Sequence, residues 1–283
     1  MAFDKKATRR NARLRLAISG TAGAGKTYSA LLIAKEFGGR IGLIDSERGS
    51  SQKYAGAPGI PEFFVEDIGE KTVQEYLAKI QEAADAGIEM LVIDSYSHSW
   101  IGALEMVDKM GGSKFSNGWK EVSPLVSKLV DSVLSYPGHV IATMRSKAEY
   151  AIEKNEQGKA IPKKIGMATV ARDGTDYEFD VMLDLTPEGG LSVSKTRCSA
   201  LNGQLYTRDD IPKIAKALKA WLTEGAPVSA KDTLADKIKF AQTIESLLAL
   251  VPEIKTLAAD DQAALKPAFV AKKNELVDST GAE

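Results

Sequence analysis

One stretch of the sequence decides the fold: Gly20-Thr21-Ala22-Gly23-Ala24-Gly25-Lys26-Thr27. Its spacing is G-x-x-x-x-G-K-T, in which the glycines let the backbone curve closely around an anion. Residues 13–18 alternate between apolar and other side chains, which predicts a strand just before the loop. Residues 27–37 predict a helix just after it, and the free N–H groups at the start of such a helix point at a bound phosphate. The stretch therefore predicts a phosphate-binding loop between a strand and a helix.

The spacing of this loop is specific enough to predict ATP and Mg²⁺ as cofactors. We expect Lys26 to contact the β- and γ-phosphates, a role in both binding and catalysis, and Thr27 Oγ1 to bind Mg²⁺. The expected nucleotide contacts are Gly20, Thr21, Ala22, Gly23, Ala24, Gly25, Lys26, Thr27 and Tyr28.

Two carboxylates stand where apolar strands are expected to end. Asp94 follows the apolar run 90–93 and is expected to be the second protein ligand of Mg²⁺. Glu47 closes Ile44-Asp45-Ser46-Glu47, where a carboxylate beside the γ-phosphate can orient and deprotonate the attacking water. From spacing alone a second interpretation stays open, in which Glu47 is a solvated loop residue or Asp45 holds the neighbouring loop.

Strands and helices alternate through the first half of the chain. Expected strands at 14–18, 41–44, 90–93 and 140–144 are separated by expected helices at 27–37, 72–86 and 119–136. This alternation predicts an α/β fold with right-handed βαβ units and a mainly parallel, twisted sheet flanked by helices. The strand 140–144 is expected to end beside the γ-phosphate, so Thr143 or Arg145 could sense hydrolysis there; the alternative is a surface turn with scattered charges.

The pattern changes after residue 148. Residues 149–173 are polar and rich in lysine, and the runs 177–185 and 191–195 predict two late antiparallel strands joined by the turn 187–190. A further helix is expected to begin at Asp209 or Asp210 and to run to about Leu222. In the C-terminal part, apolar residues fall on one helical face from Leu234 to Val251, and a second helix is expected around 265–276.

These patterns divide the chain into four parts. They are a basic N-terminal arm (1–12), an ATPase core (13–223), a linker (224–230) and a small helical C-terminal extension (231–283).

Composition excludes some classes of function. The net charge of -1 provides no global attraction to nucleic acid or to anionic membranes, so any such affinity must come from a local patch. Cys198 is the only cysteine, which rules out an internal disulfide, and we expect it to be a small buried residue. His98 has no cysteine or acidic residue at metal-site spacing, so no zinc site is expected. No apolar run approaches the roughly 20 residues that span a bilayer, and the expected location is cytoplasmic.

The order of these parts resembles the RecA/RadA recombinase core. More closely, the chain resembles the short phage ATPases of RecA-like fold that are grouped with single-strand annealing proteins. The resemblance covers roughly residues 13–222. The stretches 171–180 and 195–197 are more specific to this group than the phosphate loop, which many families share. The matching stretches are 18–27, 43–47, 91–100, 171–180 and 195–197.

The resemblance implies roles for residues outside the loop. It makes Glu47 the catalytic carboxylate, and it implies that Lys195 and Arg197 reach the ATP of the next subunit in a ring or filament. The alternative for those two residues is an edge strand protected by its charges. Residues 149–172 stand where RecA-like proteins carry mobile DNA-binding loops, although a solvated surface hairpin is the alternative. The candidate single-stranded-DNA contacts are Lys154, Lys159, Lys163, Lys164 and Arg172.

The chain also departs from that family. RecA itself has a glutamine at the end of the fourth strand, where this chain offers Thr143 and Arg145. A separate N-terminal polymerisation domain is not expected, and the short basic segment 5–15 is the candidate for that role.

The leading hypothesis is an oligomeric, DNA-dependent ATPase that converts ATP to ADP and phosphate during annealing or strand exchange. Its expected partners are single-stranded DNA, further copies of itself and a single-strand-binding protein, in a phage-infected bacterium. Three alternatives stay open. The first is a ring-forming, helicase-like motor and the second is a small-molecule kinase. The third is an ATP-gated adaptor that would expose Leu247, Leu248 and Val251 as anchors.

Overall fold

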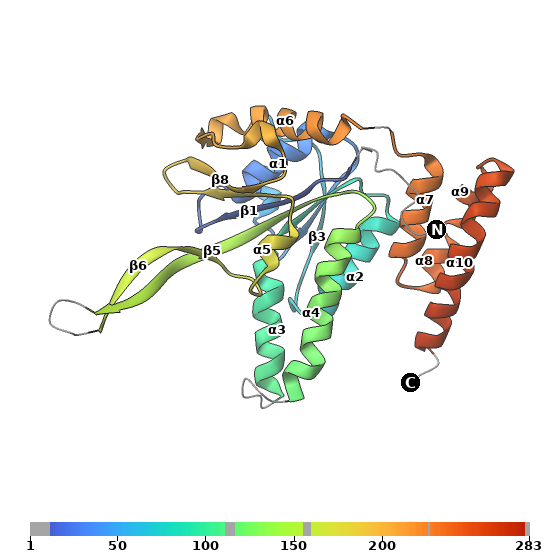
Figure 1. The fold of residues 1–283 in the computed structure, drawn as a ribbon, viewed down its shortest axis with the longest axis horizontal. Coiled ribbons are helices and arrows are strands. Elements are labelled where there is room, and N and C mark those ends of the chain that lie inside the picture. The colour runs from blue at the N-terminus through green and yellow to red at the C-terminus, as the bar shows by residue number, and fades with distance from the viewer. Residues whose placement is uncertain (1–11, 111–116, 155–159, 226, 281–283) are drawn as a thin grey trace, which may run out of the picture.

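The phosphate-binding loop leaves the end of a central strand, β1 (Arg15–Gly20), in a nine-stranded mixed sheet (Figure 1). The computed structural model describes residues 12–110, 117–154, 160–225 and 227–280, and for 117, 148–154, 160–166 and 279–280 it describes the backbone alone. The other strands are β2 (Ile41–Asp45), β3 (Phe64–Asp67), β4 (Met90–Asp94), β5 (His139–Lys154), β6 (Ala160–Thr169), β7 (Val181–Leu185), β8 (Gly190–Thr196) and β9 (Tyr206–Thr207).

The strand order explains why the ends of several strands meet at the loop. It is β3-β2-β4-β5-β1-β7-β8-β9, with parallel pairing from β3 to β7. β8 and β9 then add antiparallel strands at one side, and β6 pairs antiparallel with β5. The predicted α/β class, mainly parallel sheet and late antiparallel strands are therefore confirmed.

Helices cover both faces of the sheet (Figure 1). One face carries α1 (Lys26–Phe37) and α6 (Ile211–Thr223), which pack side by side. The other face carries α2 (Val73–Asp85), α3 (Ser97–Lys109) and α4 (Asn117–Ser135). Short helical turns complete this part: η1 (Ser51–Tyr54), α5 (Thr175–Glu178), η2 (Ser199–Leu201) and η3 (Arg208–Asp210).

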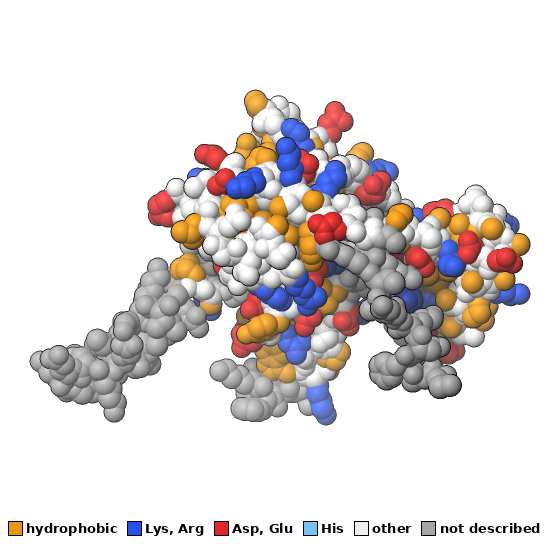
Figure 2. Space-filling view, turned by 45° about the horizontal axis from the view of Figure 1, so that its top comes forward, with side chains coloured by type: hydrophobic (Ala, Val, Ile, Leu, Met, Phe, Trp, Pro, Cys, Tyr) orange, Lys and Arg blue, Asp and Glu red, His pale blue; other side chains and the backbone are white. Residues whose placement is uncertain are grey.

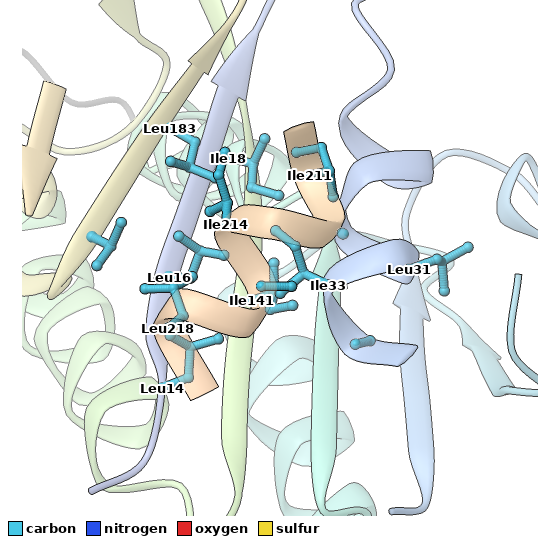
Figure 3. Packing of buried hydrophobic residues seen from close by; sticks show 14 of the residues in the cluster. Leu14, Leu16, Ile18, Leu31, Ile33, Ile141, Leu183, Ile211, Ile214 and Leu218 are labelled. Atoms are coloured by element: carbon cyan, nitrogen blue, oxygen red, sulfur yellow. The ribbon is translucent and has the colours of Figure 1, made fainter. Parts of the chain in front are cut away.

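Alternation along β1 builds a core on each side of the sheet. Leu16 and Ile18 point into the layer under α1 and α6, where they meet Ile214 and Leu218 of α6 (Figure 3). Ala17, between them, belongs to the opposite core. Each fully buried Leu or Ile contributes about 1.5–3 kcal/mol of transfer free energy, so these layers fix the position of the loop at the end of β1.

The C-terminal helices have an apolar cluster of their own. They are α7 (Ala230–Phe240), α8 (Ile244–Leu248), α9 (Val251–Lys255) and α10 (Ala259–Thr280). Contacts to the rest of the chain include the ion pair of Arg13 with Asp236 at 2.7 Å and the edge-on packing of Tyr136 against Phe240. Leu247 is fully buried in this cluster, whereas Leu248 is 47% exposed. Within the described residues, no helix is long and apolar enough to cross a membrane.

The expectation of one helical face from Leu234 to Val251 is wrong. Thr243 accepts a hydrogen bond from the Ser246 N–H at 3.1 Å, and Ser246 Oγ accepts one from the Thr243 N–H. This reciprocal capping begins a new helix at Ile244, after the first helix has ended. Apolar periodicity does not show where such side-chain capping divides a helix.

Two expected strands also have different limits. β5 does not end at Met144 before a polar loop; it runs on to Lys154 and pairs with β6. Pairing with β6 supplies the backbone hydrogen bonds, so a polar sequence can be strand there. The strand expected from Tyr177 begins at Val181, because Thr175–Glu178 forms a helical turn. β3 and α3 were not expected from the sequence.

His139 joins the start of β5 to β1 and depends on being neutral. Its Nδ1 accepts a hydrogen bond from the Leu14 N–H at 2.9 Å, and its ring packs against Phe37. Burial, followed by the charges of Arg15, Arg13 and Lys219, lowers the pKa of His139 to about 4.

We predict that His139 makes the unfolding free energy depend on pH. The folded-state pKa lies below the ordinary histidine value of 6.5, so this stabilisation is complete above pH 6.5 and is lost as the pH falls toward 4. Wild type should lose about 3 kcal/mol more than His139→Gln between pH 7 and pH 4. Denaturant unfolding of both proteins at several pH values measures the difference. Parallel pH curves would show that the ring is not kept neutral.

Candidate nucleotide-binding site

The loop after β1 has the backbone geometry of an anion cradle. Gly23 and Gly25 have φ values of 79° and 89°, in the left-handed region that favours glycine. Gly25 is the N-cap of α1, and neither a side-chain cap nor an acidic residue occupies the first turn of that helix. The positive end of α1 is thus left for an external anion.

Lys26 adds a cation that forms no direct ion pair with an acidic side chain among the described residues. Its Nζ donates to the carbonyl oxygens of Gly20 at 3.0 Å and Thr21 at 2.9 Å. Burial lowers the pKa of Lys26, an effect opposed by the charges of Asp94 and Glu47. The buried Thr21 Oγ1 finds no hydrogen-bond partner within the part of the chain that the structure describes. A bound phosphate would compensate these groups, so the loop fits a nucleotide polyphosphate.

Asp94 joins the loop to two strands. Thr27 Oγ1 donates to Asp94 Oδ2 at 2.6 Å, and Thr143 Oγ1 donates to Asp94 Oδ1 at 2.5 Å. Asp94 is only 2% exposed, and burial raises its pKa although both hydroxyls oppose that shift. A cation beside it would favour the ionised carboxylate.

The donor set around Asp94 fits Mg²⁺. This ion prefers oxygen ligands and is usually held by one or two carboxylates together with substrate phosphates and water. Thr27 Oγ1 and one Asp94 oxygen are the adjacent protein donors here. No group of three or more His, Cys, Asp or Glu side chains that could hold a metal lies among the described residues.

Glu47 is engaged by an arginine. Its Oε2 lies 2.6 Å from Nη2 of Arg145, and its Oε1 accepts from Nε and Nη2 of the same guanidinium at 3.1 and 2.7 Å. The Glu47 side chain is 27% exposed, so it is not the freely solvated loop residue of the second interpretation. Its carboxylate is a general-base candidate that a cation holds in place.

Asp45 shapes the turn that carries Glu47. Its Oδ1 accepts from the Glu47 N–H at 2.6 Å, and its Oδ2 accepts from the N–H and hydroxyl of Ser51 at 3.0 and 2.5 Å. The fully buried Asp45 side chain therefore holds the neighbouring loop, while Glu47 faces Arg145.

His98 and Ser97 belong to this site, and the sequence reasoning did not place them there. His98 Nε2 lies 3.8 Å from Glu47 Oε1, and its Nδ1 lies 2.7 Å from Ser46 Oγ. Burial lowers the pKa of His98, while Glu47 opposes that shift. Ser97 Oγ accepts from the Arg145 N–H at 2.8 Å. Both residues follow Asp94 closely in the sequence, and this proximity to a predicted Mg²⁺ ligand could have indicated that they lie at the site.

Arg145 also marks the point where β5 leaves the sheet. The Val170 N–H donates to the Arg145 carbonyl at 2.7 Å, and Ser146 pairs with Thr169 as the hairpin of β5 and β6 begins. That hairpin projects from the body of the molecule (Figure 1). By backbone register it carries Lys154, Lys163 and Lys164.

Two of the predicted DNA contacts are not among the lysines that the described hairpin carries. Lys159 lies outside the described residues. Arg172 lies at the base of the hairpin and donates to Ser127 Oγ of α4 at 3.1 Å. On the face drawn in Figure 2, the described basic and acidic side chains are interspersed.

Lys195 and Arg197 lie away from the loop of their own chain. In the antiparallel β8, Lys195 pairs with Met182 near the start of β7, whereas the loop follows the other end of this parallel set. Lys195 Nζ donates to the carbonyls of Asp176, at 3.1 Å, and Tyr177. Arg197 pairs with Asp180 at 3.1 Å. The structure thus separates these two cations from the phosphate loop of their own chain.

The remaining loop residues serve packing as well. Ala24 is fully buried in the core under α1, so only its backbone is available to a nucleotide. Tyr28 packs against Tyr54, with ring centroids 6.0 Å apart.

A family model described as an AAA domain matches residues 12–206, more than half of the chain. The match includes the phosphate loop, Glu47, Asp94, Arg145 and the late strand with Lys195. A search of curated proteins finds no match.

We predict that Thr27→Ala weakens magnesium-dependent nucleotide binding, because it removes the hydroxyl beside Asp94. Loss of an outer partner of a metal site costs about 10- to 100-fold in affinity, and loss of a ligand should cost at least about 10-fold. Thr27→Ser keeps the hydroxyl and is the matched control. Calorimetric titration with ATP, in Mg²⁺ and in EDTA, measures the effect. Equal affinities of both variants in Mg²⁺ would remove Thr27 from the metal site.

Proposed function

This chain belongs to the AAA-domain family of P-loop ATPases, and we propose that it binds single-stranded DNA and hydrolyses ATP in recombination. In this proposal it acts as a homo-oligomer in annealing or strand exchange. The observation that carries the proposal is the course of β5, which passes from Thr143 and Arg145 at the ATPase site directly into the lysine-bearing hairpin. One continuous strand can thereby connect a nucleic-acid surface with the catalytic groups.

The site residues divide the work of hydrolysis. Lys26 and the N–H groups at the start of α1 bind phosphate oxygens, and Thr27 and Asp94 hold Mg²⁺. When bound, this ion neutralises charge that develops on the transferred phosphoryl group. Glu47 orients the attacking water and accepts its proton, and the neighbouring His98 supports the Glu47 side chain.

Arg145 has two partners in this proposal. Its guanidinium binds the Glu47 carboxylate in the structure, which lowers the availability of that carboxylate as a base. A γ-phosphate near the end of β5 competes for the same guanidinium, because phosphate and carboxylate are both matched by its fork of N–H donors. Transfer of Arg145 to the γ-phosphate frees Glu47 for catalysis and moves the base of the hairpin.

Nucleic acid is proposed to bind along the hairpin. Lys154, Lys159, Lys163 and Lys164 neutralise backbone phosphates, with Arg172 at the base, in a contact that does not depend on sequence. Single-stranded DNA has flexible, accessible phosphates, and an oligomer multiplies weak contacts along one strand.

Lys195 and Arg197 are proposed to act on the ATP of a neighbouring subunit. Two observations support this role: they lie at the opposite end of the sheet from their own loop, and the Arg197 side chain is 63% exposed. Cations supplied in trans stabilise the charge of a transferring phosphoryl group strongly.

We predict that Glu47→Gln lowers the ATP hydrolysis rate by roughly 10²–10⁴ while nucleotide affinity stays within a few-fold of wild type. The amide keeps the size of the side chain but cannot accept the proton of water. Glu62→Gln, which changes an exposed glutamate just before β3, is the control and should hydrolyse ATP at the wild-type rate. Turnover by Glu47→Gln at the rate of this control would exclude Glu47 as the base.

The test of the whole proposal is the steady-state ATPase rate with and without single-stranded DNA, at low and moderate salt. We expect DNA to raise the rate. With about four phosphate contacts, DNA affinity should fall about 50-fold between 50 and 200 mM salt. The double substitution Lys163→Ala with Lys164→Ala should weaken the stimulation and reduce its salt dependence. A rate indifferent to DNA would leave the ATPase in place and favour an adaptor or a small-molecule phosphotransferase.

A further inference from the structure

Arg208 is held against the phosphate loop by the segment between β9 and α6. The Thr207 N–H and hydroxyl both bond Asp210 Oδ2, at 2.9 and 3.0 Å, in a capping box that fixes this turn. The Arg208 N–H donates to the carbonyl of Gly189 at 2.9 Å, which ties the turn to the connection between β7 and β8. The position of the Arg208 backbone is therefore set by the fold and not by a ligand.

The guanidinium of Arg208 lies between two glycines. A Cβ atom built on Gly25 would lie 3.1 Å from its Nη1 and 3.2 Å from its Cδ. A Cβ atom built on Gly189 would lie 3.1 Å from its Nη2. The absence of side chains at both positions lets the arginine approach the backbone at the start of α1 this closely.

This placement brings the Arg208 guanidinium close to other positive charges. Arg208 joins Lys26 at the positive end of α1, where a cation is unfavourable and an anion is favourable. Its side chain is half-buried, and within the described part of the chain its guanidinium makes no hydrogen bond or ion pair. Its N–H donors are thus available at the surface that the loop presents to phosphates.

The sheet order gives a nucleotide one orientation over the loop. Asp94, Thr143 and Glu47 come from β4, β5 and the end of β2, on one side of β1, and they define the γ-phosphate end. Arg208 and Gly189 lie on the other side of β1, beyond β7. A triphosphate with its γ-phosphate toward β4 and β5 therefore extends its α-phosphate toward Arg208.

We propose that Arg208 is a nucleotide-binding residue whose guanidinium contacts the α-phosphate of ATP bound by the same chain. The proposal rests on the ATPase function above and adds a contact on the nucleoside side of the site. A guanidinium suits this place because its planar fork of donors matches two phosphate oxygens at once. Arg208 lies outside the stretch that the family model matches, so the family assignment does not supply this role.

The test compares ligand affinities of the full chain by calorimetry in Mg²⁺, with ATP, ADP and inorganic tripolyphosphate as probes. Arg208→Gln should bind all three about 10- to 100-fold more weakly than wild type, because each has a phosphate at the α position. Arg208→Lys keeps the charge but lacks the planar fork of donors, so its affinities should lie between those of wild type and Arg208→Gln. Lys216→Gln, which removes an exposed lysine of α6, is the charge-matched control and should bind like wild type.

Each outcome has a distinct meaning. Melting temperatures without ligand show whether a variant is folded. If Arg208→Gln is not folded, Arg208→Lys is compared with wild type in its place. Weaker ATP binding with unchanged tripolyphosphate binding would overturn the α-phosphate contact and place Arg208 against the base. Wild-type affinity of Arg208→Gln for all three probes would overturn the role of Arg208 and leave the ATPase proposal standing. Failure of wild type to bind ATP would overturn both.

Discussion

The nucleotide site depends on one buried carboxylate, Asp94. Its two oxygens accept hydrogen bonds from Thr27 at the start of α1 and from Thr143 on β5. A charge that is 2% exposed is costly unless it is compensated, so the elements that supply those hydroxyls must stay in register with the end of β4. The same burial makes a divalent cation favourable there, because the cation stabilises the ionised carboxylate. The burial that orders the site would thus also favour Mg²⁺ binding there.

A second interaction connects this site to the rest of the molecule. Arg145 binds Glu47 at the point where β5 leaves the sheet and enters the hairpin with β6. Two groups compete for one guanidinium in the proposed mechanism, the catalytic carboxylate and a γ-phosphate. Such a competition provides two discrete arrangements, and a ligand that favours one of them shifts the balance between resting and active enzyme. In this mechanism, a displacement along β5 would carry that balance to the hairpin.

The sheet also separates functions in space. Within one chain, residues at the ends of β1, β2, β4 and β5 lie around the phosphate loop, and Arg208 lies against that loop from beyond β7. Lys195 and Arg197 lie at the opposite end of the parallel strands. Cations at that end face away from their own loop, which is why they are proposed to act on the ATP of a neighbouring subunit.

The sequence alone determined the features that contiguous residues encode: the phosphate loop, the alternation of strands and helices, and the carboxylates at strand ends. A loop whose backbone binds phosphate needs its glycines, lysine and threonine close together in the chain, so the sequence alone is enough to recognise it. The tertiary structure decided what depends on distant segments. Glu47 meets Arg145 across 98 positions, β6 makes a polar segment into a strand, and Arg208 reaches Gly25 from the segment between β9 and α6. These contacts depend on which segments the fold brings together, and no apolar period or local motif specifies them.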